Sequence, residues 1–402
     1  MDQPPTESLM FRRAGELTLY AASPLAIIVT SPLLAQGLGV EARGQLGVAQ
    51  SVAALATSIG ALGQAEVLLG DLRSGKGSPL AASMVAFGGS LVVGVGTAAA
   101  LHTMRVDPAT IVAVLILLPW MSQAPLWRGY AVSRGQLLRP VYANALGAML
   151  RVALVAALAM SSRLAAVSAF WAVQGSAVVA AVVVLGVNYV RGVRSTQAEG
   201  ELPNRVEYLR RGAPLVLFAM FTAVTLNADV LMLSWLGSAS ALGVYAATAS
   251  LSLAALSVSA AFKSRVQLAA FSSRSLASVK RELAIVILAG GVAASAVAFG
   301  SSLVVQVLLG PGYEAAEGLV QILAFASWAL VLLDCMHGLL AALGLRRGLV
   351  AVGAVGAAST LVFLAILVPL AGAEGAAWAT LVSYSLAAIA GWLIARRSGA
   401  LS

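Results

Sequence analysis

Charge is scarce in this chain. Only 10% of its 402 residues are Asp, Glu, Lys or Arg, whereas an ordinary soluble domain has about 25%. Hydrophobic residues make up 60% of the sequence, and a soluble core of this length cannot bury so many apolar side chains. The composition therefore excludes an ordinary soluble protein and predicts a membrane protein.

Cysteine and histidine are nearly missing as well. Cys335 is the only cysteine, which excludes disulfides and a thiolate metal site. The two histidines, His102 and His337, lack metal-ligand spacing with acids or with the thiol. The glycine-rich run GLGVEARG (37–44) is expected to be a helix turn at the outer side, not a strand-to-helix phosphate loop. We therefore expect no enzyme activity, no metal and no cofactor.

Long apolar blocks take the place of these chemical groups. Each has about 20 to 30 residues, enough to cross about 30 Å of hydrocarbon as a helix, and none alternates as a barrel strand would. The sequence predicts an all-α polytopic membrane protein with twelve transmembrane helices, at residues 15–37, 46–70, 79–101, 109–132, 138–160, 164–189, 213–236, 241–262, 283–308, 318–343, 348–370 and 374–395.

The basic residues indicate the orientation. With a cytoplasmic N-terminus, the outer loops hold only Arg43, Arg105 and Arg163 of the 25 Lys and Arg residues, and Arg128 and Arg151 lie inside spans. The positive-inside rule then predicts that both termini are cytoplasmic. The net charge of +9 is attributed to this rule and to contact with anionic lipids, so no nucleic-acid partner is expected.

A long polar interruption at residues 191–213 divides the twelve blocks six and six. The start of the second block, ARGQLGVAQS (42–51), is similar to that of the eighth, ALGVYAATAS (241–250). The pattern predicts two parallel six-helix lobes around a central cleft, an arrangement suited to alternating access. The expected divisions are an N-terminal lobe at 1–190, a cytoplasmic linker at 191–212 and a C-terminal lobe at 213–402.

Four segments, in this order along the chain, resemble motifs of polysaccharide (O-antigen type) flippases, a branch of the multidrug/oligosaccharidyl-lipid/polysaccharide exporter superfamily. They are LGVEARGQLGVAQSVAALATSIGALGQAEVLLGDLRS (38–74), NADVLMLSWLGSASALGVYAATASLS (227–252), LLGPGYEAAEGLVQILAF (308–325) and LVPLAGAEGAAWATLVSY (367–384). The resemblance implies a multi-pass flippase of the bacterial cytoplasmic (inner) membrane, which translocates an undecaprenyl-pyrophosphate-linked oligosaccharide to the outer leaflet for lipopolysaccharide or exopolysaccharide biosynthesis. It also implies coupling to H⁺ or Na⁺ and contact with polysaccharide assembly proteins.

Two other functions were weighed against the flippase. The first is a sodium- or proton-coupled small-molecule (multidrug) exporter of the same superfamily; that branch usually has an acid in helix 1, where this chain has only Glu16 near the inner end. The second is a membrane enzyme such as an O-antigen polymerase or ligase. Such an enzyme needs a large outer loop with basic catalytic residues, which the block spacing does not provide.

A flippase cavity must hold a pyrophosphate and many sugar hydroxyls, so it needs fixed cations and hydrogen-bonding side chains. Arg151 is the main candidate, because Asn144, Gly147 and Arg151 share one helix face at spacings i, i+3 and i+7. The alternative for Arg151 is an ion pair that holds the bundle together. Arg128, near the cytoplasmic end of its span, either grips pyrophosphate or snorkels to lipid head groups. Gln174 is expected to line the cleft.

Asp229, in TLNADVLMLSW (225–235), is the first candidate for ion coupling. Thr222, Thr225 and Asp229 form a polar stripe in the outer half of their span, and the aspartate either titrates or braces the lobe. Asp334 and His337, one helical turn apart, either pass a proton or form a satisfied polar pair.

Three further charges are expected at the cytoplasmic entrance. Lys263 and Arg265 are interpreted as orientation charges that also offer a handhold for lipid phosphate, and Glu66 as a lobe-closing charge.

Overall fold

The computed structural model describes residues 6–64, 68, 78–134, 136, 138–196, 205–251, 266 and 276–398. In these ranges the secondary structure is helical, without a strand. The helices are α1 (Thr6–Gly60), α3 (Pro79–Thr103), α4 (Pro108–Ser133), α5 (Leu138–Met160), the consecutive segments α6 (Ala166–Phe170), η1 (Trp171–Gly175), α7 (Ser176–Ala181), η2 (Val182–Gly186) and α8 (Val187–Thr196), then α9 (Arg205–Leu236), Ala239–Leu251, α11 (Leu276–Phe299), α12 (Ser301–Val304), η3 (Val305–Leu309), α13 (Ala316–Ala342) and α14 (Arg346–Arg397).

Polar side chains cap the helix starts at the outer and inner turns. The Ser78 hydroxyl accepts a hydrogen bond from the Ala81 amide at 3.3 Å, directly before Pro79 at the first position of α3. The carboxylate of Asp107 accepts from the Thr110 amide at 3.1 Å. Because lipid offers no partner for an amide, these caps fix where the spans begin.

Two of the predicted connections between spans, at 38–45 and 371–373, are helical except at one glycine each. Gly39, with φ 72°, interrupts α1, and Gly372, with φ 56°, interrupts α14. Both angles lie in the left-handed region that glycine adopts without steric cost. Among the described residues nine helices are long and apolar enough to cross a membrane, and α1 and α14 each contain such a break. The total of twelve spans stays a prediction.

The predicted cytoplasmic linker at 191–212 stays a prediction. Its described residues are helical, because α8 continues to Thr196 and α9 begins at Arg205. Polar composition reports where a helix leaves the hydrocarbon and not where it ends. The lobe boundaries themselves stay a prediction.

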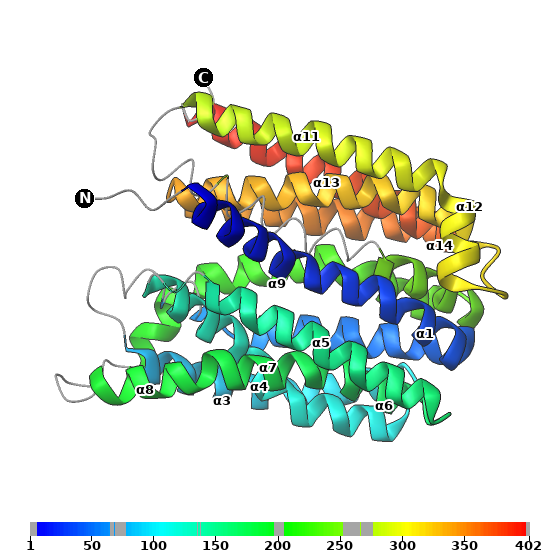
Figure 1. Ribbon diagram of the computed structural model, residues 1–402, viewed down its shortest axis with the longest axis horizontal. Coiled ribbons are helices and arrows are strands. Elements are labelled where there is room, and N and C mark those ends of the chain that lie inside the picture. Colours follow the sequence, from blue (N-terminus) through cyan, green and yellow to red (C-terminus); the bar gives the residue numbers. More distant parts are fainter. Residues whose placement is uncertain are drawn as a thin grey trace.

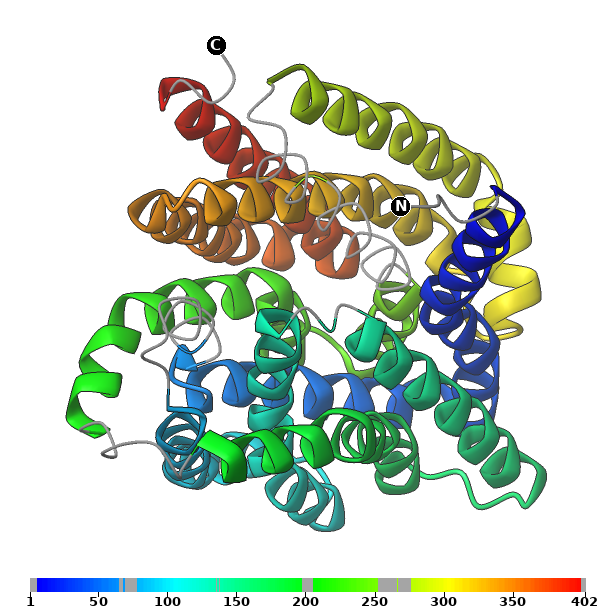
Figure 2. The same cartoon turned by 60° about the vertical axis from the view of Figure 1, so that its left-hand side comes forward.

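The long helices form one bundle. In Figures 1 and 2, α11, α13 and α14 lie on one side and α3, α4, α5 and α7 on the other. α1 packs against α3 and α5 and also against α9, which in turn packs against α14. α1 and α9 therefore connect the two sides of the bundle.

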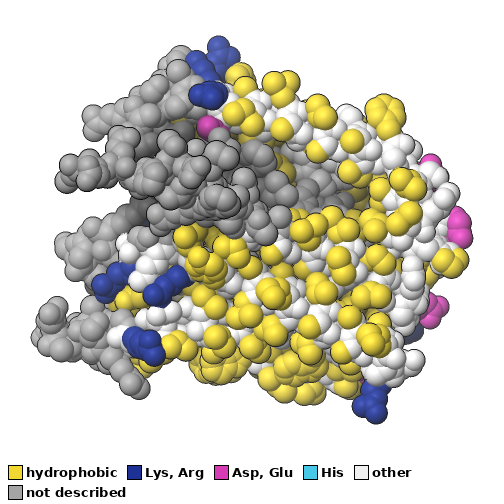
Figure 3. All heavy atoms as spheres, in the orientation of Figure 1, with side chains coloured by type: hydrophobic (Ala, Val, Ile, Leu, Met, Phe, Trp, Pro, Cys, Tyr) yellow, Lys and Arg dark blue, Asp and Glu magenta, His cyan; other side chains and the backbone are white. Residues whose placement is uncertain are grey.

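The surface of the bundle is apolar. Figure 3 shows hydrophobic side chains across most of the described part of this face, with charged side chains confined mainly to its left and right ends. α1 begins and α14 ends at the left end (Figure 1). Large exposed side chains such as Val92, Phe299 and Leu370 are more than three quarters uncovered, as expected of residues that face lipid. The chain is thus a multi-pass membrane protein.

Candidate substrate cavities and the outer seal

A central cavity of about 350 Å³ lies between the two sides of the bundle. Residues from α1, α5, η1, α9, the helix Ala239–Leu251, α13 and α14 line it. Its charged lining residues are Arg43, Arg151 and Asp229, and its polar ones include Gln50, Gln174 and Asn227. In the described part of the chain this cavity therefore carries more positive than negative charge.

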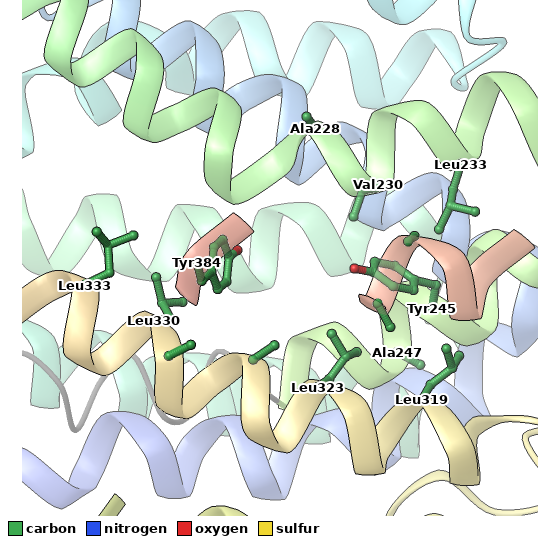
Figure 4. Packing of buried hydrophobic residues seen from close by; sticks show 14 of the residues in the cluster. Ala228, Val230, Leu233, Tyr245, Ala247, Leu319, Leu323, Leu330, Leu333 and Tyr384 are labelled. Carbon is green, nitrogen blue, oxygen red and sulfur yellow. The ribbon is translucent and has the colours of Figure 1, made fainter. Parts of the chain in front are cut away.

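Asp229 is buried and well supplied with donors. Its Oδ2 accepts a 2.6 Å hydrogen bond from the Tyr245 hydroxyl and a 3.5 Å one from Thr380, and its Oδ1 accepts from the Val230 amide at 2.8 Å. Tyr245 is fully buried (Figure 4). Because three helices contribute these groups, Asp229 ties α9 to the helix Ala239–Leu251 and to α14. Both expected roles of Asp229, titration and bracing of the lobe, stay predictions.

Arg43 is not in an outer loop, contrary to the sequence prediction. It follows the Gly39 break closely, so it sits on the first turn of a new helical segment, and only 2% of its surface is exposed. Its Nη2 donates to the carbonyl oxygen of Ala246 at 3.3 Å. Its Nε and Nη1 have no hydrogen-bond partner among the described atoms.

A second cavity, of about 310 Å³, adjoins the central one. Arg128, Asn144, Arg151 and Gln174 all line it, and Arg151 and Gln174 line the central cavity too. The structure thus brings together the four side chains expected to contact substrate. Arg128 Nη2 donates to Asn144 Oδ1 at 3.1 Å, and its choice between pyrophosphate and lipid head groups stays a prediction. Both side chains are exposed, so the cavity is open on their side.

Several features of these two cavities are suited to binding an anion. Arg151 Nε has no partner within the described structure, and Arg43 and Arg151 are close enough to repel each other electrostatically. Gln174 belongs to the π-helical turn η1, a local widening that often occurs at functional sites. At about 1.5 Å per residue, Arg151 lies about 14 Å from the outer end of α5, and Arg128 lies about 8 Å from the inner end of α4.

Asp334 and His337 lie apart from the central cavity. They line a pocket of about 20 Å³ together with Thr222 and Thr225. His337 Nδ1 is 4.0 Å from Asp334 Oδ1, and its ring meets the ring of Phe218 edge-on at 5.0 Å between centroids. Of the predicted stripe on α9, only Asp229 therefore lines the central cavity, while the two threonines line this pocket.

The largest of these cavities, of about 600 Å³, is apolar. Side chains of α1, the helix Ala239–Leu251, α11, η3 and α13 line it. Ser327 lines both this cavity and the central one, and the consecutive residues Ile27 and Ile28 line one each. A charged cavity and an apolar cavity are thus neighbours.

The two segments that look alike in the sequence pack against each other at the end of the bundle that the positive-inside rule predicts to face outward. A Cβ on Gly44 would lie 3.2 Å from the Gly243 nitrogen, and one on Gly47 would lie 2.7 Å from Ala246 Cβ. A Cβ on Gly243 would overlap the Val40 carbonyl oxygen. We call this contact, between residues 40–47 and 242–246, the outer seal.

A turn from the other side of the bundle also reaches helix α1 near this end. Tyr313, in the Gly-Pro-Gly-aromatic turn between η3 and α13, is 1% exposed and donates to the Ala35 carbonyl oxygen at 3.2 Å. Burial raises the pKa of the Tyr313 hydroxyl, so the hydroxyl keeps its proton for this bond. This bond ties the turn to α1 beside the outer seal.

Lys263, Arg265 and Glu66 lie outside the described residues, so their expected place at the cytoplasmic entrance stays a prediction. Sequence reasoning missed Arg43, Tyr245 and Thr380. Only the glycine-rich turn before Arg43 pointed to a change of helix direction there, and nothing in the sequence marked the tyrosine and threonine as partners of Asp229.

No family profile and no curated protein sequence matches the chain. Solved structures do. An inward-facing multidrug resistance MATE family transporter of the MOP superfamily gives a TM-score of 0.66 at 14% identity, covering 96% of this chain and 98% of that one. The chain has the MATE transporter fold. An outward-facing MATE family transporter of the same superfamily gives 0.62 at 15% identity, covering 96% and 95%.

A third similar structure is a MOP superfamily transporter from Pyrococcus furiosus, for which the reverse polarity of the binding pocket suggests a different function. Its TM-score is 0.63 at 14% identity, covering 96% of each chain. At such low identity these likenesses establish the MATE fold of this chain and not its cargo. The flippase branch of the superfamily is not singled out by them.

Proposed function

We propose that this chain is an alternating-access transporter that moves an undecaprenyl-pyrophosphate-linked oligosaccharide from the inner to the outer leaflet of a bacterial cytoplasmic membrane. One observation carries the proposal. Arg43 and Arg151 line the central cavity with guanidinium nitrogens that no described atom of the protein satisfies, while Asp229 in the same cavity is already held by three donors.

A diphosphate supplies what these arginines lack. Buried polar groups nearly always have hydrogen-bond partners, and buried charges are costly unless they are paired. Phosphate oxygens accept strong, charge-assisted bonds from guanidinium groups. The amide groups of Gln50, Gln174 and Asn227 in the same cavity offer donors and acceptors to sugar hydroxyls.

The neighbouring apolar cavity supports a cargo with a hydrocarbon chain. It adjoins the charged cavity at Ser327, so a molecule with a diphosphate head and a prenyl tail would meet complementary surfaces in both. A fully water-soluble cargo would leave this second surface unused.

Coupling to H⁺ or Na⁺, two rocking lobes, and contacts with anionic lipids and polysaccharide assembly proteins are part of the same proposal. The candidates for coupling are Asp229 and the Asp334–His337 pair. A histidine changes its charge near neutral pH more readily than other side chains.

Reconstitution tests the proposal directly. Proteoliposomes that contain a polyprenyl-pyrophosphate disaccharide are treated with an external glycosidase, and the fraction of cleaved lipid is followed with and without an imposed proton or sodium gradient. We expect the protein to expose the inner pool and Arg151→Gln to slow this at least about tenfold, while Arg163→Gln, an exposed arginine outside the cavities, behaves like the unchanged protein. An inner pool that stays protected under every gradient contradicts the proposal.

A second candidate is a sodium- or proton-coupled small-molecule exporter. The solved neighbours favour it, since they include multidrug resistance MATE transporters over nearly the whole length. The two candidates differ in the charge of the cargo, because a cationic dye would be repelled by Arg43 and Arg151. Efflux of a cationic dye that is unaffected by neutralising Arg151 would favour the exporter.

A further inference from the structure

Arg43 holds a charge in an unusual setting. It is 2% exposed, and its one hydrogen bond among the described contacts goes to a neutral acceptor, the Ala246 carbonyl, at 3.3 Å. Removing a cation from water costs several kcal/mol, which a single long bond to a carbonyl does not recover. This burial therefore indicates a second state of the protein, in which Arg43 binds a stronger hydrogen-bond acceptor than the Ala246 carbonyl.

That acceptor does not come from the carboxylate in the same cavity. Asp229 accepts from Tyr245, Thr380 and the Val230 amide, and Arg151, the other charged lining residue, repels Arg43. Nε and Nη1 of Arg43 are left without a partner at the wall of the central cavity. An anion in this cavity is attracted by Arg43 and by Arg151, because both line it.

The remaining nitrogen of Arg43 belongs to the outer seal. Its bond to Ala246 joins α1 to the helix Ala239–Leu251, where Gly47 packs against Ala246 and Gly44 against Gly243. The same guanidinium thus contacts both the cargo cavity and the contact that closes the outer end. No other arginine in the described part of the chain combines these two positions.

We infer that Arg43 is the residue through which an anion in the central cavity opens the outer seal. A diphosphate that binds Nε, Nη1 and Arg151 draws the guanidinium away from Ala246, because a phosphate oxygen is a stronger acceptor than a carbonyl. The seal then loses its one charged tie. When the anion leaves, Nη2 returns to Ala246 and the outer end closes.

Binding of the anion would shift the population from the closed to the open state of the outer seal. A ligand favours the open state only if it binds that state more tightly than the closed one. In the closed state one Arg43 nitrogen is kept by Ala246, and in the open state it is available to the anion, so the open state offers one more charge-assisted bond. The inference rests on the proposed function in one respect, the anionic cargo.

Spin labels across the outer seal test it. Glu41 and Ser240 are exposed on opposite sides of the seal, and labels on Glu41→Cys and Ser240→Cys in a Cys335→Ala background report their separation by double electron–electron resonance in nanodiscs. Inorganic pyrophosphate is the probe. We expect it to increase the long-distance population in the protein with Arg43 and in the control Arg163→Gln, and to leave Arg43→Gln unchanged.

Binding of pyrophosphate, measured by calorimetry on the same samples, distinguishes failure of the proposed anionic cargo from failure of the gating role of Arg43. If the protein with Arg43 does not bind pyrophosphate, the anionic cargo of the proposed function is wrong. If it binds but the distances stay fixed, or if pyrophosphate shifts the distances in Arg43→Gln as far as in the protein with Arg43, the gating role of Arg43 is overturned. Arg43→Lys, which keeps the charge but offers fewer donors, should open only in part.

Discussion

The Tyr245 hydroxyl lies 2.6 Å from Asp229 Oδ2, and this bond joins two helices that follow one another in the chain, α9 and Ala239–Leu251. Tyr245 also lies 3.3 Å from Thr380 on α14. Figure 4 shows Tyr245 and Tyr384 between α9 and α13 with their hydroxyl groups directed toward one another. A single buried carboxylate thus organises the polar centre of this half of the bundle.

Removing the Tyr245 hydroxyl should destabilise the protein. Tyr245→Phe leaves the buried Asp229 with fewer donors, and loss of a hydrogen bond to a charged group costs about 1.5–3 kcal/mol. We expect a lower thermal unfolding temperature in detergent for Tyr245→Phe. Tyr142→Phe, at a tyrosine that is 47% exposed, is the control and should unfold like the unchanged protein.

Asp229→Asn should impair transport more than membrane insertion, and its effect should not add to that of Tyr245→Phe. Residues that share a hydrogen bond usually show coupling energies of about 0.5–3 kcal/mol in a double-mutant cycle. The measurement is the unfolding of the two single variants and the double variant, alongside membrane abundance. Additive effects would mean that the bond contributes nothing, whereas loss of Asp229→Asn from the membrane would assign the residue to bracing alone.

Arg151→Gln should weaken pyrophosphate binding by at least about tenfold. Arg151 lines both polar cavities, and one charge-assisted bond is worth about 1.5–3 kcal/mol, which is more than a factor of ten in affinity. Calorimetric titration checks this against Arg163→Gln. Unchanged affinity in Arg151→Gln would show that anions bind elsewhere.

Gly243→Ala should prevent the outer seal from closing. The new Cβ would overlap the Val40 carbonyl oxygen, a backbone atom that cannot turn aside. We expect the Glu41 and Ser240 labels to move apart even without pyrophosphate. Gly88→Ala provides the matched control, because its Cβ would meet nothing within 4 Å. Identical distances in the two variants would contradict the close packing.

Ala293→Phe should block the lipid-linked cargo without changing pyrophosphate binding. Ala293 lines the apolar cavity on α11, so a phenyl ring there takes the space of a hydrocarbon tail. Ala296→Phe, also exposed on α11 but outside that cavity, serves as the control. Lipid translocation that is equally fast in both variants would exclude the apolar cavity as the tail site.

Hydropathy located helices such as α3 and α5, because a span in lipid must satisfy its own backbone hydrogen bonds. The predicted block at 138–160 coincides with α5, and that at 79–101 nearly coincides with α3. Hydropathy could not predict that the helix would be interrupted only at Gly39 in α1 and only at Gly372 in α14. Whether a loop has several residues or one depends on the backbone angles of a single glycine, which composition does not report.

Within the candidate site, the sequence could predict which side chains of a single helix share a face. Asn144 and Arg151 share a face of α5 by spacing alone, and both line the same cavity. Arg43 could not be assigned in this way, because its burial depends on Ala246 of a distant segment. The same holds for Tyr245 and Asp229, whose contact is a matter of packing between helices.

The outer seal also says something about symmetry. Gly44 and Gly243 occupy equivalent places in the two similar segments, as do Gly47 and Ala246, and each meets its own counterpart. Contacts between like residues are the mark of an isologous interface, the kind that two identical subunits form about a two-fold axis. The chain therefore closes this end with two like segments, as a homodimer does about its two-fold axis.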